Sequence, residues 1–268
     1  MITSANNQQL KQVSALLKKS KERREKQSFV VEGPRMVVEA PAEALKAVYV
    51  AESYENNPEN KELLKELLTK CKSVGAIYET VADSVFKSVS DTQTPQGIMA
   101  VVAMPSYDLE QLIDGERTHL LLLESIQDPG NLGTMVRTGE GAGITGVIMN
   151  KTTVDLFNPK TIRSTMGSIY RMPFYVAEDL SDCLTVLKEK GVSLYAAHLK
   201  GEHYYTEENY TKACGFLIGN EGNGLSDEIA NQADTYIKIP MEGQVESLNA
   251  AISATLLMYE ANRQRRLK

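Results

Sequence analysis

The sequence predicts an α/β protein of two domains, the second of which is built on a parallel sheet. Three observations lead to this prediction. The chain has 268 residues, and domains contain roughly 150 residues on average. Short apolar runs alternate with helical patterns along the chain, as in sheets covered by helices. The apolar runs near the C-terminus end in glycine or proline, so these strands are followed by loops whose backbone can approach a ligand.

The composition is that of a globular protein and argues against several other classes. Hydrophobic residues make up 42% and charged residues 24% of the chain, and no stretch approaches the run of about 20 apolar residues that spans a membrane. The N-terminal residues lack the apolar core of a secretory signal, so we expect a cytoplasmic protein without a membrane partner. Cys71, Cys183 and Cys214 are far apart and have no ligand spacing to the histidines, so neither a disulfide framework nor a metal site is expected.

The first predicted helix, about residues 6–26, carries a concentrated positive charge. Between Lys11 and Lys26 there are seven basic and two acidic residues, whereas the whole chain has a formal net charge of −6. Such a patch can bind phosphates while the acidic remainder keeps the protein in solution. The alternative is that these side chains stay solvated and complement the helix dipole.

The remainder of the N-terminal part predicts a small α/β domain over residues 1–106. A strand and a glycine turn with Arg35 follow the basic helix in the segment SFVVEGPRM. Further strands are expected at 47–51, 75–78 and 96–104, and helices at 58–72 and 81–89. Residues 107–117 are the expected linker.

The larger domain, residues 118–268, begins with a buried strand at Thr118. A turn leads into a helix at 131–143, and strand and helix then follow in turn. Further strands are expected at 146–149 and 192–196, and further helices at 159–164 and 179–190. This alternation predicts a parallel sheet covered on both faces.

Two more strands, close to the C-terminus, end in candidate binding loops. The apolar run 214–218 stops at Gly219, and the run 236–239 stops at Pro240. Ser247 then stands at the N-cap position of a last helix, whose apolar residues follow at helical spacing as far as RQRR. Each loop alone is an ordinary strand-to-helix turn, but their density favours a binding site.

Three segments, in this order, resemble the motifs of the SpoU family of RNA ribose methyltransferases, which belongs to the SPOUT class. They are LLLLESIQDPGNLGTMVRTGEGAGITGVI at 120–148, GNEGNGLS at 219–226, and IPM at 239–241 with SLN at 247–249. In addition, SDTQTPQG at 90–97 resembles the end of the RNA substrate-binding domain that precedes the catalytic domain in many members. The resemblance implies S-adenosylmethionine as cofactor, an RNA substrate, a homodimer, and a C-terminal trefoil knot, the α/β-knot fold.

The resemblance also assigns catalytic roles. Arg137, six positions after Asn131, matches the arginine that the family places at the target ribose, where it would bind a neighbouring phosphate or accept the 2′ proton. A guanidinium stays protonated at neutral pH, which favours the phosphate. Glu221 would orient Arg137 or Asn131, and Asn249 would orient the arginine or the substrate. Ser247 completes the candidate catalytic set, unless it is only a helix cap.

Other positions resemble ligand contacts of the family. Gly219, Ile239 and Leu248 match its cofactor contacts, with Asn220 and Met241 nearby. Without the resemblance, core and turn positions would be the simpler interpretation. The candidate RNA-binding residues are Lys18, Lys19, Lys21, Arg23, Arg24, Arg35 and Arg163. Arg163 would alternatively support the dimer.

The predicted function is the transfer of a methyl group from S-adenosylmethionine to a ribose 2′-hydroxyl of RNA. Ribosomal RNA is favoured over transfer RNA because of the additional RNA-binding domain. A non-catalytic RNA-binding or ribosome-assembly protein on the same fold is a second hypothesis. An enzyme acting on a small nucleotide is a third, and the basic helix argues against it.

Overall fold

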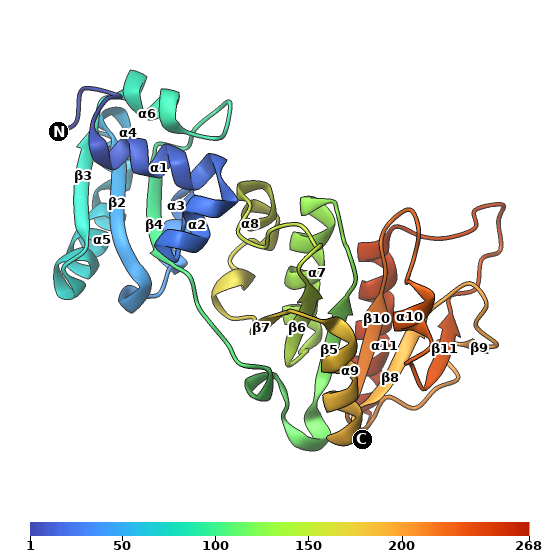
Figure 1. Cartoon of the computed structure of the whole chain (residues 1–268). Coiled ribbons are helices and arrows are strands. Elements are labelled where there is room, and N and C mark those ends of the chain that lie inside the picture. Colours follow the sequence, from blue (N-terminus) through green and yellow to red (C-terminus); the bar gives the residue numbers. More distant parts are fainter. Residues whose placement is uncertain (268) are drawn as a thin grey trace. The chain divides into compact units, whose positions relative to one another are not determined.

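The computed structural model describes residues 1–267, and its contacts divide the chain into two compact units (Figure 1). The first unit contains Met1–Pro105 together with Phe157–Tyr170. The second contains Ser106–Leu156 and the chain from Arg171 onward. No helix in the described part of the chain combines the length and the apolar character needed to cross a membrane.

The first unit is a four-stranded mixed sheet with helices around it. In the strand order β1-β4-β2-β3, β4 pairs antiparallel with β1 and β2, and β2 pairs parallel with β3. The strands are β1 (Ser28–Glu32), β2 (Leu45–Ala51), β3 (Ile77–Val81) and β4 (Ile98–Ala103). The helices are α1 (Gln8–Lys18), α2 (Ser20–Lys26), α3 (Pro34–Glu39), α4 (Glu52–Glu55), α5 (Lys61–Val74) and α6 (Asp83–Val89). Apolar residues of α1, α6 and the sheet share one core, so the expected small α/β fold is confirmed.

The first helix is broken, and the prediction of one helix over residues 6–26 is wrong. Lys19 has an extended backbone (φ −126°, ψ 116°) between α1 and α2. Arg23 stabilises this break: its side chain is buried, and Nη1 donates to the carbonyls of Leu16 (2.6 Å) and Leu17 (3.2 Å). The carbonyls in the last turn of a helix lack partners within the helix, and the folded-back guanidinium supplies one.

A segment from the C-terminal half of the chain completes the first unit. Residues 157–170 contain α8 (Pro159–Thr165). The ring centroid of Phe157 lies 4.8 Å from that of Phe29, which is fully buried. Tyr170 Oη donates to the carbonyl of Met36 (2.8 Å). The core of the first unit therefore includes residues from the predicted second domain, 118–268.

The second unit is built on a seven-stranded sheet in the order β7-β6-β5-β10-β8-β11-β9, and all its neighbouring strands are parallel. The strands are β5 (His119–Leu123), β6 (Gly146–Asn150), β7 (Phe174–Ala177), β8 (Ser193–Ala197), β9 (His203–Tyr204), β10 (Cys214–Ile218) and β11 (Thr235–Lys238). Neither β7 nor β9 was among the predicted strands. The parallel α/β architecture itself is confirmed.

Helices cover both faces of this sheet (Figure 1). They are α7 (Pro129–Ala142), α9 (Leu180–Glu189), α10 (Asp227–Ala230) and α11 (Ala250–Arg266). On one face, Leu120 and Leu122 of β5 share a core with leucines of α9 and Ile229 of α10. On the other face α7 packs closely against α11. Gly141 of α7 lies so near Tyr259 of α11 that an added Cβ would be only 2.8 Å from Tyr259 Oη. The trefoil knot implied by the resemblance stays a prediction.

Phe157→Ala should destabilise the first unit, because it removes a large side chain, 8% exposed, from the buried ring of Phe29. Truncating a buried phenylalanine costs about 3–5 kcal/mol, and we expect about 3 kcal/mol in urea unfolding followed by circular dichroism. Ser164→Ala in the same segment removes a hydroxyl that donates to the carbonyl of Lys160 and serves as the control. Unfolding curves that coincide for Phe157→Ala and wild type would contradict the assignment of this segment to the core.

Candidate functional site

Two loops of the second unit meet at the carboxyl ends of the adjacent strands β5 and β10. The loop after β5 leads into α7 on one face of the sheet, whereas the loop after β10 leads into α10 on the other. Diverging connections of this kind open the crevice in which α/β proteins bind ligands. The two loops are joined here, because the Glu124 carboxylate accepts from the N–H (2.8 Å) and the hydroxyl (2.7 Å) of Ser226.

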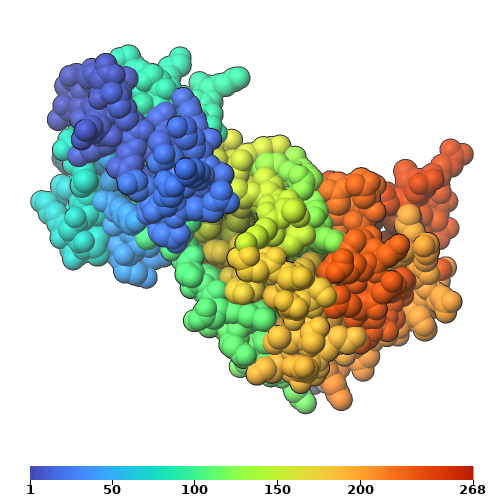
Figure 2. Space-filling view, in the orientation of Figure 1, coloured from blue at the N-terminus to red at the C-terminus, as the bar shows by residue number. Residues whose placement is uncertain are grey.

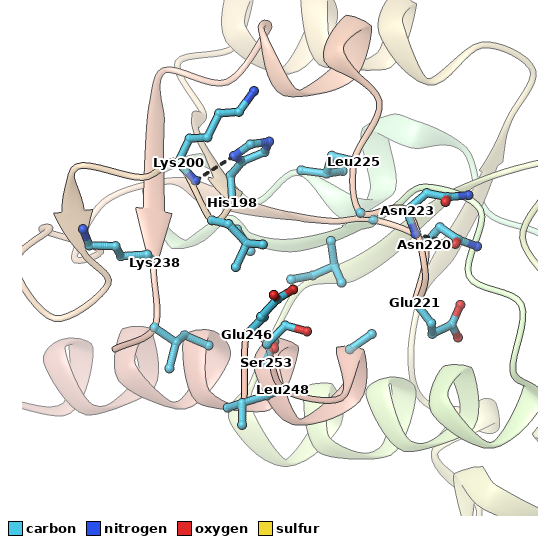
Figure 3. A pocket seen from close by; sticks show the side chains of 18 of the residues that line it. His198, Lys200, Asn220, Glu221, Asn223, Leu225, Lys238, Glu246, Leu248 and Ser253 are labelled. Atoms are coloured by element: carbon cyan, nitrogen blue, oxygen red, sulfur yellow. Dashed lines mark hydrogen bonds between the residues drawn. The ribbon is translucent and has the colours of Figure 1, made fainter. Parts of the chain in front are cut away.

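A cavity of about 610 Å³ lies beside the loop after β10. Its walls come from the loops after β8 and β10, from the end of β11, and from the first turn of α11 with the residues before it. Figure 3 shows His198 and Lys200 on one side of the cavity and Leu248 and Ser253 on the other. The five predicted cofactor residues all line it: Gly219, Asn220, Ile239, Met241 and Leu248.

The loop after β10 is shaped by a glycine and an amide. A Cβ at Gly219 would lie 2.1 Å from backbone atoms of Gly224 and Leu225, so only glycine fits there. Asn220 Oδ1 accepts from the N–H groups of Gly222 (2.9 Å) and Asn223 (3.1 Å) and thereby closes a tight turn.

The cavity suits a nucleoside-sized ligand. Its volume falls within the range of about 300–1,000 Å³ that is usual for small-molecule sites. Ile218, Leu225, Ile239 and Leu248 contribute apolar side chains to the walls, and the glycine loop contributes backbone donors and acceptors. Apolar walls with a few polar groups are what the flat base and the hydroxyls of a nucleoside require.

A polar cluster lies next to the cavity and joins three predicted catalytic residues. The Glu221 carboxylate accepts from the N–H groups of Gln127 and Asp128 and from Asn131 Nδ2, each at 3.0 Å. Asn131 Oδ1 in turn accepts from Asn249 Nδ2 at 2.9 Å. Glu221 thus orients Asn131 at the start of α7, which is one of the two roles that the sequence suggested for it.

The environment of Glu221 favours its charged form. Partial burial by itself raises the pKa of this carboxyl, but the hydrogen bonds from Asn131, Gln127 and Asp128 outweigh burial and hold the pKa below its ordinary value. The carboxylate is therefore ionised at neutral pH and accepts from all three donors.

Asn249, and not Ser247, caps the last helix. Its Oδ1 accepts from the N–H groups of Ala251 (2.9 Å) and Ile252 (3.3 Å), and α11 begins at Ala250. The expectation that Ser247 is the N-cap is corrected, because the asparagine side chain reaches the free N–H groups of the first turn. Ser247 instead lines the cavity.

Arg137 is exposed on α7 and is not part of the cavity wall. Within residues 1–267 its guanidinium makes no hydrogen bond and no ion pair. The predicted contact between Glu221 and Arg137 is therefore absent from the described residues, and the five donors of this guanidinium remain available to a ligand.

The predicted RNA-binding residues differ in their surroundings. Lys18, Lys19, Lys21 and Arg24 are exposed on α1, on α2 or between them, and Figure 2 shows these N-terminal helices at the surface in dark blue. Arg35 is exposed and pairs with Glu39 (3.0 Å), and Arg163 pairs with Asp91 (2.7 Å). The prediction that Arg23 binds RNA is wrong, because its buried side chain binds the end of α1 and is not available to RNA.

Residues 197–200 form a wall of the cavity that was not predicted from the sequence. A signal was available, because this polar loop follows a predicted strand at the same sheet edge as Gly219. His198 Nδ1 accepts from the N–H of Lys200 (3.1 Å), and its ring stacks on Tyr236 with centroids 4.9 Å apart. These contacts fix the loop at the rim of the cavity. Among the described residues, no cluster of three His, Cys, Asp or Glu side chains could share a metal ion.

Comparisons with known proteins find relatives over nearly the whole chain. A model described as the SpoU rRNA Methylase family matches residues 118–259, and one described as the MRM3-like substrate binding domain matches residues 7–100. The 23S rRNA (guanosine(2553)-2′-O)-methyltransferase RlmP of Bacillus subtilis is 35% identical over 261 residues, covering 96% of this chain and 97% of that protein.

Two solved structures contain a bound cofactor. The crystal structure of the AdoMet-bound rRNA methyltransferase from Sinorhizobium meliloti has a TM-score of 0.88 at 30% identity and covers 98% of this chain and 97% of that chain. The SpoU methyltransferase AviRb from Streptomyces viridochromogenes, in complex with the cofactor AdoMet, has a TM-score of 0.87 at 26% identity and covers 97% of this chain and 99% of that chain.

Glu221→Gln should lower stability at neutral pH, because an amide cannot accept from all three donors. For an exposed site of this kind we expect about 1 kcal/mol. The difference in unfolding free energy between wild type and variant is fully present above 4.5, the ordinary pKa of the glutamate carboxyl. It is lost as pH falls through the lowered pKa of Glu221 in the folded state. Urea unfolding of both proteins between pH 3 and pH 7 measures it.

The control for this series is Glu242→Gln, which alters an exposed carboxylate of the same second unit. It should leave stability unchanged throughout the pH range. A stability difference between Glu221→Gln and wild type that stays constant down to pH 3 would rule out the carboxylate as its origin.

Proposed function

The chain belongs to the SpoU rRNA methylase family, and on this basis we propose that it transfers a methyl group from S-adenosylmethionine to a ribose 2′-hydroxyl of ribosomal RNA. The observation that carries the proposal is the position of the cavity, lined by Gly219, Ile239 and Leu248, beside the hydrogen-bonded cluster of Glu221, Asn131 and Asn249. The Bacillus subtilis relative is named for this reaction on 23S rRNA, which supports ribosomal over transfer RNA. Such a substrate implies a cytoplasmic enzyme.

Different residues of the site bind the cofactor and position the reacting groups. When bound, S-adenosylmethionine would supply a methyl group on a positively charged sulfur. The ribose oxygen would take the methyl group and release its proton to water, and the sulfur would keep the electron pair of the S–CH₃ bond as a neutral thioether. Ile239 and Leu248 supply apolar walls, and the backbone around Gly219 supplies hydrogen-bonding groups. Catalysis by positioning requires that the reacting groups be held rigidly, and Glu221 holds Asn131 for this purpose.

Arg137 binds the phosphate next to the target ribose. Its guanidinium is exposed and keeps its charge, and a planar guanidinium matches two phosphate oxygens at once. A fixed positive charge beside the ribose also lowers the free energy of the oxyanion that forms as the 2′ proton leaves.

The enzyme works as a homodimer. Support comes from α11, where Ile252 and Tyr259 are 49% and 45% exposed although the helix packs on the sheet with its other side. The two residues are seven positions apart and so lie on one face of the helix. An exposed apolar stripe on a helix next to the site is suited to a second copy of the chain.

Arg137→Ala should abolish methyl transfer while the cofactor still binds, because Arg137 does not line the cavity. We expect a fall in kcat of at least about 100-fold, the usual scale for removing a group that stabilises the transition state. The assay is transfer of label from radiolabelled S-adenosylmethionine to total RNA from a strain that lacks this gene. Cofactor binding is measured by calorimetry, with Arg117→Ala, which alters an exposed arginine of the same unit, as the control.

Three results would contradict parts of the proposal. Full activity of Arg137→Ala would remove the arginine from the mechanism. Absence of label from every RNA, including assembled and partly assembled ribosomal particles, would favour an RNA-binding protein that does not catalyse transfer. Label in transfer RNA alone would correct the substrate class.

The exposed lysines at the end of α1 and directly after it should contribute to RNA affinity through phosphate contacts. The double variant Lys18→Ala/Lys19→Ala is expected to weaken binding to ribosomal RNA fragments of any sequence and to reduce the slope of log affinity against log salt by about 2. Filter binding at several salt concentrations measures both quantities. Lys61→Ala/Lys65→Ala on α5 removes the same charge from another exposed surface, and an equal loss in this variant would argue against a local RNA site.

A further inference from the structure

The loop after β5 contains a strained residue at the centre of the site. Three non-glycine residues within 1–267 have a positive φ: Gln27 (46°), Ser125 (57°) and Met166 (51°). Gln27 and Met166 are the C-caps of α2 and α8, where this conformation is common. Ser125 ends no helix, and a non-glycine residue in this region costs of order 1 kcal/mol or more unless its surroundings hold it.

Hydrogen bonds from two neighbouring segments hold Ser125 in this conformation. At the end of β6, Asn150 Oδ1 accepts from the Ser125 N–H (2.9 Å), and Asn150 Nδ2 donates to Ser125 Oγ (3.2 Å). Ser125 Oγ also shares a hydrogen bond with Thr152 Oγ1 (2.6 Å). The carbonyl of Ser125 accepts from Gln127 Nε2 (3.0 Å). The backbone of Ser125 is therefore held by side chains at and after the end of β6 and by Gln127 of its own loop.

The carbonyl of Ser125 also accepts a hydrogen bond from the loop after β10, which we call the cofactor loop. Asn220 Nδ2 donates to it at 2.9 Å, across 95 positions of the chain. The other end of the same amide, Oδ1, accepts from Gly222 and Asn223 and closes the turn of the cofactor loop. One end of the Asn220 amide thus shapes its own loop, and the other end connects that loop to the loop after β5.

The adjacent residues Asn220 and Glu221 both bind the loop after β5. Asn220 holds the carbonyl of Ser125, and Glu221 holds the N–H groups of Gln127 and Asp128 and the side chain of Asn131. The first contact fixes the distance between the loops, and the second fixes the start of α7. Without the first, the position of Asn131 relative to the cavity would depend on the contacts of Glu221 and Asn249 with Asn131 and of Glu124 with Ser226.

We propose that Asn220 is a positioning residue. Through its hydrogen bond to the carbonyl of Ser125 it holds Asn131 at a fixed position relative to the cavity. The inference rests on the proposed function and revises the expectation that Asn220 serves the cofactor directly. A misplacement of about 1 Å in such a site costs on the order of 100-fold in rate. Loss of the contact therefore lowers kcat and leaves cofactor affinity nearly unchanged.

Asn220→Asp is the sharpest test. The aspartate keeps an oxygen that accepts from Gly222 and Asn223, so the cofactor loop retains its turn, but it loses the donor to Ser125 and opposes a carboxylate to a carbonyl. We expect kcat for methyl transfer to fall at least tenfold, and the Kd for S-adenosylmethionine, measured by calorimetry, to change less than threefold. The reverse pattern, with a Kd weakened tenfold or more and kcat at saturation unchanged, would assign Asn220 to the cofactor and overturn the proposal.

A second pair of variants tests the strained position itself. Ser125→Gly removes the hydroxyl with its bonds to Asn150 and Thr152, but it accepts the left-handed backbone without strain and keeps the carbonyl, so its kcat should fall less than that of Ser125→Val. Ser125→Val resists this backbone, because a β-branched side chain is disfavoured there, and kcat should fall at least tenfold with cofactor binding retained. Equal kcat values for the two variants would overturn the role of the strained carbonyl.

Hydrogen exchange separates this inference from the proposed function. In Asn220→Asp the amides of Gln127 and Asp128, which donate to Glu221, should exchange at least tenfold faster than in wild type, whether or not the protein methylates the RNA supplied. Unchanged exchange would overturn the coupling between the loops. An inactive wild type with faster exchange in the variant would reject the methyltransferase proposal and still support the coupling.

Discussion

The geometry of the site depends on the carboxylate of Glu221. The parallel strands β5 and β10 end side by side, and the chain leaves them toward opposite faces of the sheet. Nothing in the backbone of a parallel sheet holds two such loops together, because the ladder hydrogen bonds end with the strands. A carboxylate with several lone pairs can accept from two backbone N–H groups and one side chain at once. Glu221 does this across about ninety positions of the chain, and the start of α7, with Asn131, is fixed relative to the cavity as a result.

The last helix is held at both of its ends. At its start, Asn249 caps the helix with Oδ1 and binds Asn131 with Nδ2. Near its end, the Arg265 guanidinium donates at 2.8–2.9 Å to the carbonyls of Arg117, Thr118 and Tyr210. Burial, with the positive charge of Arg265 nearby, lowers the pKa of His119 to about 3, so its imidazole is neutral and does not repel the guanidinium. The last helix is thus fixed by polar contacts both at the site and near the amino-terminal end of β5.

Some basic side chains of the first unit bind backbone carbonyls of the unit itself, and others are exposed to solvent. Arg23 binds carbonyls at the end of α1, Lys46 Nζ binds carbonyls at the end of α2 at 3.3 Å, and Lys70 Nζ donates to the carbonyls of Val38 and Ala40 around the end of α3. Cations at helix C-termini satisfy free carbonyls and complement the helix dipole. A count of basic residues along the sequence therefore overstates the charge available to RNA. The exposed remainder is concentrated at the junction of α1 and α2.

The sequence by itself determined the parallel architecture and most strand positions, and its resemblance to the family pointed to five of the residues that line the cavity. Buried strands are continuous apolar runs, and loops that approach a ligand need glycine, so both are visible in local patterns. Only the tertiary structure decided that the first helix breaks at Lys19, that α11 starts after Asn249, that residues 157–170 belong to the first core, and that Ser125 is strained. The physical reason is the same in each case. Local pattern records whether a residue is buried and which backbone it prefers, whereas the partner of a polar group or of an aromatic ring lies elsewhere in the chain and is fixed only when the chain has folded.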